Sequence, residues 1–167
     1  MSADALPATG SVSESVAATP ESLWPYVSDP SIPARFSTEL LEAAFVAGAT
    51  PDVGAVIEGR NSNGAFSWTT TSTVVECAEP RVFRWATGDA DAPTATWGFE
   101  VAPTADGSIL THTVVFHPGV APLGPAIEAE PERAHEIVDA RLAQVLANME
   151  LTVRGIASLA EGRATGS

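Results

Sequence analysis

The sequence contains no lysine, and this absence limits the partners that the protein can bind. All eight basic residues are arginines, and they stand against 21 aspartates and glutamates, which gives a net charge of −13. Nucleic acids and anionic membranes attract proteins that carry a basic surface. The composition therefore argues against a nucleic-acid partner, and the acidity is explained most simply as a charged surface that keeps the protein in solution.

Cysteines and long apolar runs are also scarce. Cys77 is the only cysteine, which excludes a disulfide framework and a zinc site built on cysteines. No apolar run reaches the roughly 18 residues that a membrane-spanning helix needs. Met1–Gly10 lacks the basic start and apolar middle of a signal peptide. We therefore expect no membrane insertion and a cytoplasmic location.

Motifs for metals and common cofactors are missing as well. The three histidines His112, His117 and His135 have no metal-ligand spacing. The chain has no glycine-rich phosphate loop and no serine nucleophile elbow. We expect neither a metal nor a cofactor, so that any chemistry must come from ordinary side chains.

The apolar pattern near the end of the chain predicts one long helix over Pro131–Leu159. A proline is tolerated in the first turn, and at 1.5 Å per residue the helix would be roughly 40 Å long. Such a helix must lie across another element, and a second, partly polar stripe beside the apolar one is expected to line a space. The apolar stripe is Val138, Leu142, Val145, Met149, Ile156 and Leu159, and the second stripe is Arg141, Val145, Asn148, Thr152 and Gly155.

Alternation of polar and apolar residues predicts a β-rich region before this helix. Ser11–Ala17 is the first predicted strand. Pro20 and Pro30, each preceded by a capping residue, mark the starts of two short helices. The six further predicted strands are Leu40–Ala47, Val53–Asn61, Phe66–Cys77, Arg81–Thr87, Thr94–Val101 and Ser108–His117.

This order of elements indicates an α+β fold, because runs of antiparallel strands are kept apart from the helices. The length of the chain favours one domain with one core. We expect that domain to cover residues 11–162, with flexible ends at 1–10 and 163–167.

The same order, together with four stretches of sequence, resembles the START-like SRPBCC superfamily, whose members have the helix-grip (Bet v 1-like) fold. The bacterial polyketide cyclase/dehydrase-type proteins look most similar. The resemblance implies a strongly curved antiparallel sheet wrapped around the C-terminal helix, two short helices after the first strand, and an internal apolar cavity. The superfamily includes lipid carriers, hormone receptors and aromatase/cyclases, so the fold does not decide the function. The four stretches are TPESLWPYVSDPSIPARF at 19–36, FSWTTTSTVVE at 66–76, ATWGFEV at 95–101 and LANMELTVRGIASLAEG at 146–162.

Strand alternation separates the residues that would face such a cavity from those that would face water. Any one aromatic among them is explained equally well as plain core. Three tryptophans accompanied by inward hydroxyls, however, are typical of the wall of a small-molecule site. The predicted cavity residues are Phe36, Ile57, Phe66, Trp68, Thr70, Ser72, Trp85, Trp97, Phe99, Leu110, His112, Val114, Val145, Asn148, Met149 and Thr152.

Two titratable residues are candidates for acid/base chemistry. His112 faces inward by alternation; a lone inward histidine is more often a hydrogen-bonded core residue, but histidine titrates near neutrality. Glu39 would lie at the mouth of the cavity, where a buried carboxylate needs a partner and an exposed one is simply solvated. A Glu39–His112 pair across the cavity would provide an acid/base catalyst.

The resemblance to the aromatase/cyclases implies that the apolar lining of their pocket is kept in this chain, whereas the polar residues of the pocket are changed. The pocket arginine that steadies an enolate-like oxygen in those enzymes would fall at Ser72. Their pocket tyrosine would fall near Glu39, and a tryptophan of the last strand becomes His112. The residues that match pocket positions of those enzymes are Phe36, Trp68, Trp97 and Asn148.

Three functions therefore stay open. The first is binding of a small hydrophobic or aromatic metabolite, lipid- or polyketide-like, in the cavity. The second is an aromatase/cyclase/dehydratase-type enzyme that uses His112 and Glu39 for proton transfer. The third is a partner protein that works through its acidic surface. An exposed edge strand can pair with a second copy, so monomer and homodimer both remain open.

Overall fold

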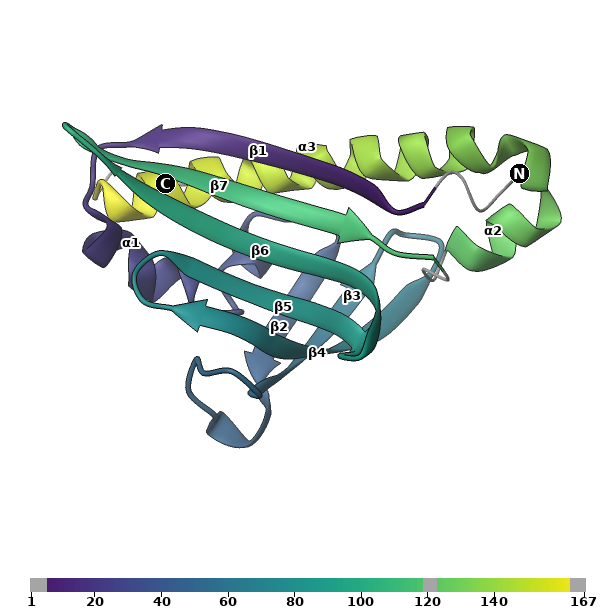
Figure 1. The fold of residues 1–167 in the computed structure, drawn as a ribbon, viewed down its shortest axis with the longest axis horizontal. Coiled ribbons are helices and arrows are strands. Elements are labelled where there is room, and N and C mark those ends of the chain that lie inside the picture. The colour runs from purple at the N-terminus through teal and green to yellow at the C-terminus, as the bar shows by residue number, and fades with distance from the viewer. Residues whose placement is uncertain (1–5, 119–122, 163–167) are drawn as a thin grey trace.

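The computed structural model describes residues 6–118 and 123–162, and one antiparallel sheet forms its centre (Figure 1). The seven strands lie in the order β1-β7-β6-β5-β4-β3-β2, so that β1 crosses over to pair with the last strand. Every neighbouring pair is antiparallel. The strands are β1 (Ala8–Val16), β2 (Leu40–Phe45), β3 (Val56–Ser62), β4 (Ser67–Ala78), β5 (Val82–Asp89), β6 (Ala92–Thr104) and β7 (Gly107–Phe116).

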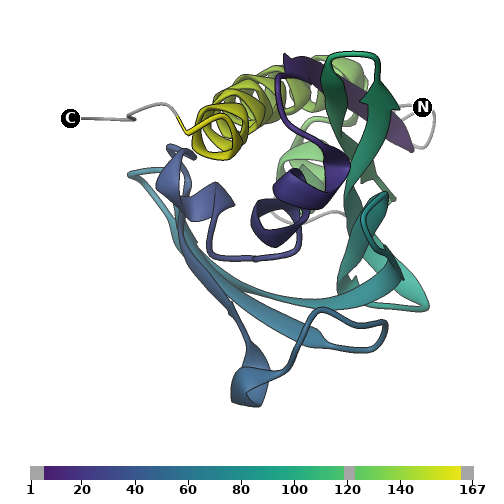
Figure 2. The same cartoon turned by 90° about the vertical axis from the view of Figure 1, so that its left-hand side faces the viewer.

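A long helix closes the open side of the curled sheet. This helix, α3 (Ala134–Ala160), runs beside β1 and extends past its N-terminal end (Figure 1). The end-on view shows the sheet bending away beneath the helix (Figure 2). Its buried residues include Val138, Val145, Met149 and Ile156. These four belong to the apolar stripe predicted from the sequence. The predicted α+β helix-grip fold is therefore confirmed.

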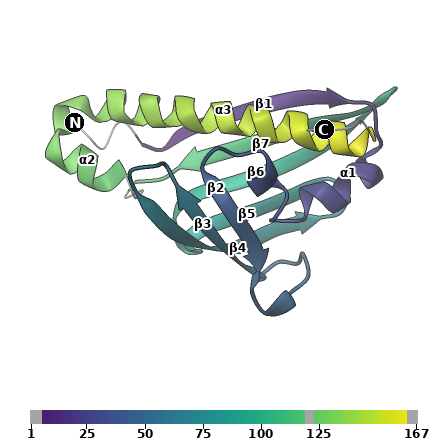
Figure 3. The same ribbon diagram turned by 180° about the vertical axis from the view of Figure 1, so that it is seen from behind.

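Two apolar clusters make up the core, one at each end of α3. At its C-terminal end Ile156 packs with Leu23 and Trp24 of α1 (Pro20–Val27) and with Phe83 and Phe99 of the sheet. Seen from behind, α1 lies under this end of α3 (Figure 3). The other cluster joins the N-terminal half of α3 to α2 (Leu123–Ala129) and to the ends of β6 and β7. Together the two clusters bury one face of α3 from Ala134 to Ala157.

The first short helix forms as predicted, and the second is much shorter. Thr19 caps α1 by accepting a hydrogen bond from the N–H of Ser22, with Pro20 in the first turn. After Asp29 the chain makes no helix, because the Asp29 carboxylate accepts hydrogen bonds from the backbone and hydroxyl of Ser31 and holds a turn instead. Only one 3-10 turn, η2 (Pro33–Arg35), follows.

Some predicted boundaries move by a few residues. The first strand begins at Ala8, opposite Phe116 of β7, so residues 8–10 belong to the sheet and not to a tail. Pro131 opens a separate 3-10 turn, η4 (Pro131–Arg133), before α3. Another 3-10 turn, η3 (Val46–Gly48), ends β2 early. The expected flexible end at 163–167 lies outside the described residues.

Residues 6–118 and 123–162 contain neither a candidate membrane span nor a candidate metal cluster. None of their helices is long and apolar enough to cross a membrane. Nor do they bring together three or more histidine, cysteine or acidic side chains in a metal-binding arrangement.

Candidate functional site

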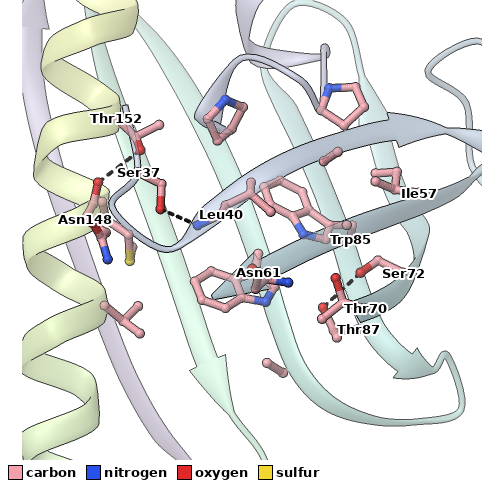
Figure 4. A pocket seen from close by; sticks show the side chains of 18 of the residues that line it. Ser37, Leu40, Ile57, Asn61, Thr70, Ser72, Trp85, Thr87, Asn148 and Thr152 are labelled. Atoms are coloured by element: carbon pink, nitrogen blue, oxygen red, sulfur yellow. Dashed lines mark hydrogen bonds between the residues drawn. The ribbon is translucent and has the colours of Figure 1, made fainter. Parts of the chain in front are cut away.

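A partly open cavity of about 190 Å³ lies between the concave face of the sheet and α3 (Figure 4). Strands β3 to β7, helix α3 and the segment at 37–40 all contribute to its wall. The wall is mainly apolar and aromatic. Of the predicted residues, the cavity is lined by Glu39, Ile57, Trp68, Thr70, Ser72, Trp85, Trp97, Phe99, His112, Val145, Asn148, Met149 and Thr152.

Strand alternation explains the sheet side of the wall. Along β4 the cavity-lining residues Trp68, Thr70 and Ser72 alternate with outward threonines, as period-2 geometry requires. Gly59 on β3 lies directly opposite Thr70. A Cβ at position 59 would come within 2.7 Å of the Thr70 hydroxyl oxygen. The glycine therefore leaves room for a polar group that faces the cavity.

The helix side of the wall is the partly polar stripe. Arg141, Val145, Asn148 and Thr152 all line the cavity, because residues three, four and seven apart share a helix face. The stripe ends at Gly155, which instead receives the ring of Phe36. A Cβ on Gly155 would lie 2.4 Å from that ring.

His112 is held in one protonation state by its surroundings. Its Nδ1 lies 2.8 Å from the carbonyl oxygen of Gly98. A carbonyl only accepts hydrogen bonds, so Nδ1 carries the proton and Nε2 keeps a lone pair. The ring stacks on Phe99 with 4.0 Å between centroids. Burial lowers the pKa of His112 to about 4, and the hydrogen bond to Gly98 offsets this only in part. The imidazole is therefore neutral near pH 7.

Glu39 pairs with Arg141, not with His112. Its two carboxylate oxygens accept hydrogen bonds from Nη1 and Nη2 of Arg141, at 2.7 and 2.5 Å. The side chains are only 18% and 15% exposed. Bidentate geometry suits arginine and carboxylate, and it takes up both oxygens of Glu39. Within the described residues no hydrogen bond joins Glu39 to His112, so their hypothesised pairing is wrong.

A second contact fixes the same segment to α3 two helical turns further on. The backbone N–H and the hydroxyl of Thr38 both donate to Oδ1 of Asn148, at 2.9 and 2.8 Å. Asn148 is thus engaged at the edge of the cavity. Together with the Glu39–Arg141 ion pair it fastens segment 37–40 over the cavity.

Four predicted residues do not line the cavity. Phe36 packs against Gly155, as described above. Phe66 is 71% exposed, because it belongs to the hairpin turn before β4, where its N–H donates to Oδ1 of Asn63 and strand alternation does not apply. Leu110 and Val114 face inward as expected. They are fully buried in the two core clusters, however, and are closed off from the cavity.

Several lining residues are missing from the predicted set of cavity residues. Asn61 continues the inward row of Ile57 and Gly59 on β3, and the alternation at 53–61 was sufficient to find it. Thr87 follows from the inward face of β5, where its hydroxyl pairs with that of Ser72 at 3.0 Å. Ser37 had no signal, because its position depends on the irregular chain between η2 and β2.

A curled antiparallel sheet that grips a long C-terminal helix around a cavity defines the helix-grip class of proteins. Within this class the chain belongs to the polyketide cyclase/dehydrase and lipid transport family, whose model matches residues 7–154. No curated protein matches the sequence.

Three solved structures illustrate the likeness. A polyketide-cyclase-like protein from Corynebacterium glutamicum, Cgl2372, is 25% identical with a TM-score of 0.63, covering 92% of this chain and 91% of its own. The di-domain ARO/CYC StfQ from the steffimycin biosynthetic pathway is 14% identical with a TM-score of 0.76, covering 96% of this chain and 52% of its own. Major latex-like protein 151 from Panax ginseng is 10% identical with a TM-score of 0.64, covering 92% and 97%. The last two show the fold alone.

Proposed function

We propose that the protein binds a small hydrophobic or aromatic molecule, lipid- or polyketide-like, in the cavity between the sheet and α3. Three tryptophans, Trp68, Trp85 and Trp97, contribute to the wall. Indole rings bury large areas, and a ligand that loses about 300 Å² of apolar surface gains about 7 kcal/mol before the costs of association. The family description, which names both polyketide chemistry and lipid transport, supports this class of ligand.

The observation that favours binding over acid/base catalysis is the state of the two candidate catalytic residues. An efficient general base has a pKa near the working pH, whereas burial lowers that of His112 to about 4. The carboxylate of Glu39 is occupied by Arg141. Neither group is set up to exchange protons at neutral pH, although Nε2 of His112 can accept a hydrogen bond from a ligand.

An aromatase/cyclase/dehydratase activity is the second candidate. It is favoured by the presence of both Glu39 and His112 in the lining of one cavity, with Nε2 of the imidazole carrying a lone pair. Substrate binding that separates Glu39 from Arg141 would release a carboxylate for proton transfer. In that case His112→Ala abolishes turnover of a polyketide-like substrate, while it leaves ligand binding largely intact.

Native mass spectrometry of the protein purified from its own host tests the binding proposal. We expect a co-purifying apolar molecule. Binding of the neutral dye N-phenyl-1-naphthylamine should fall at least about five-fold in Trp97→Ala, because the ring contributes apolar area to the wall. Ile109→Ala, on the outward face of β7, is the control and should bind normally. Unchanged dye affinity in Trp97→Ala, with the fold intact, would count against the site.

A further inference from the structure

One buried polar atom of the cavity wall has no hydrogen-bond partner among the described residues. Asn61, at the end of β3, is 8% exposed and lines the cavity. Its Nδ2 is buried without an acceptor, and in the described part of the chain its Oδ1 has no donor either. Leaving a buried amide unpaired costs stability, and such groups in folded proteins need a specific explanation.

Several of the other polar groups around Asn61 are satisfied by the protein itself, although the hydroxyl of Thr70, which also lines the cavity, has no hydrogen-bond partner among the described residues. The hydroxyls of Ser72 and Thr87 pair with each other, and that of Thr152 donates to the carbonyl of Asn148 (Figure 4). Ser37 accepts the N–H groups of Glu39 and Leu40. Nδ2 of Asn61 is therefore the one buried side-chain polar atom of the described residues that lacks a hydrogen-bond partner.

Packing does not explain the amide either. Asn61 lies opposite Leu40 on β2 and Trp68 on β4, and a leucine of similar shape would suit both neighbours. Because no group of the described residues bonds to the amide, no hydrogen bond among them fixes which of its ends faces the cavity. A half-turn of the amide presents a donor or an acceptor to a ligand.

The charges of the wall restrict what that ligand can be. Arg141 is the only arginine of the described residues that lines the cavity, and its guanidinium is held by Glu39. Asp29 adds a further carboxylate, and His112 is neutral. A ligand carboxylate would find no free cation, and burying an unpaired charge is strongly unfavourable.

We propose that Asn61 is the specificity-determining residue of the cavity: its amide holds an oxygen of a neutral aromatic ligand, and the cavity rejects carboxylates. This inference rests on the proposed binding function. It goes further by naming the residue that recognises the ligand and the charge that the ligand must have.

Three probes of equal ring size test the inference. A cavity of about 150 Å³ accepts benzene, so two-ring molecules suit one of about 190 Å³ with an open side. Naphthalene has no polar group, 2-naphthol adds a hydroxyl, and 2-naphthoate adds a carboxylate. Dissociation constants at pH 7 are measured from tryptophan fluorescence for the wild type, Asn61→Leu and Thr69→Val. Thr69 faces outward on β4, so its variant makes the same kind of polar-to-apolar change away from the cavity.

We expect the wild type to bind 2-naphthol about five-fold more tightly than naphthalene, as one added hydrogen bond allows. Binding of 2-naphthoate should be at least about ten-fold weaker than that of 2-naphthol. In Asn61→Leu the preference for 2-naphthol over naphthalene disappears, while the affinity for naphthalene is kept. Thr69→Val keeps the preference. Asn61→Leu should also unfold at a temperature no lower than the wild type, because it removes an unpaired buried amide.

The outcomes separate this inference from the proposed function. If naphthalene binds but Asn61→Leu keeps the preference for 2-naphthol, or if 2-naphthoate binds best, the role of Asn61 is refuted and the cavity remains a binding site. If none of the probes binds to the wild type, both proposals fail. If Asn61→Leu does not fold, two other measurements provide the test. The first is the ranking of the three probes on the wild type, and the second is whether Asn61→Ser retains the preference for 2-naphthol over naphthalene.

Discussion

The stability of the protein between pH 7 and pH 4.5 should be governed in large part by His112. In the folded protein burial lowers its pKa from 6.5 to about 4, whereas in the unfolded chain the imidazole titrates near 6.5. Below pH 6.5 the unfolded state therefore binds a proton that the folded state does not. Stability falls as the pH drops from 6.5 towards 4, by about 1.4 kcal/mol per pH unit for one such group. Between pH 7 and pH 4.5 this amounts to about 2 to 3 kcal/mol.

The variant His112→Gln isolates this contribution. Glutamine does not titrate, and its amide can still donate to the carbonyl of Gly98, which Thr113 also approaches. Urea unfolding at pH 7 and at pH 4.5 gives the loss of stability for each protein. The wild type should lose about 2 to 3 kcal/mol more than the variant, because the carboxylates common to both cancel in the comparison. His135→Gln, at an exposed position, is the control and should follow the wild type. Equal losses in wild type and His112→Gln would refute the buried, neutral imidazole.

Two further perturbations concern the contacts at α3. Removing either member of the Glu39–Arg141 pair should cost about 2 kcal/mol, between the values for buried and exposed ion pairs. A double-mutant cycle by thermal unfolding should give a coupling well above that of the exposed pair Glu42–Arg60, and an equal coupling would contradict the buried geometry. Gly155→Ala should lower the free energy of unfolding by about 1 to 2 kcal/mol, because the clash of the new methyl group with the ring of Phe36 outweighs the higher helix propensity of alanine. If Gly155→Ala is instead more stable than the wild type in urea unfolding, the ring of Phe36 does not pack against this position.

Within the regular helices and strands, the sequence predicted correctly which side chains face inward. The steps of three, four and seven from Val138 to Ile156 placed one face of α3 in the core. Period-2 alternation assigned the inward residues of β4 and β7, including Ser72 and His112. These predictions succeed because side-chain direction follows directly from helical and strand geometry.

The predictions failed where the chain leaves regular structure. Phe66 was extrapolated from the alternation of β4 although it lies in the preceding turn, where the Asn63 side chain directs the backbone. The partner of Glu39 is 102 residues away on α3. No local pattern reveals such a contact, because it depends on how segment 37–40 meets the helix. For the same reason the sequence placed Glu39 at the mouth but paired it with the wrong residue.

The position of the arginine argues against a simple transfer of cyclase chemistry from the family. Stabilising a developing oxyanion requires donors that are free and already aimed at the reacting oxygen. The resemblance to the aromatase/cyclases implies that their pocket arginine corresponds to Ser72 in this chain. The hydroxyl of Ser72 is paired with that of Thr87. The arginine that does line the cavity, Arg141, stands on the opposite wall and is neutralised by Glu39. Among the described residues, the cavity groups left free include the amide of Asn61, the hydroxyl of Thr70 and Nε2 of His112. These groups are suited to hydrogen-bonding a neutral ligand and carry no charge with which to stabilise an enolate.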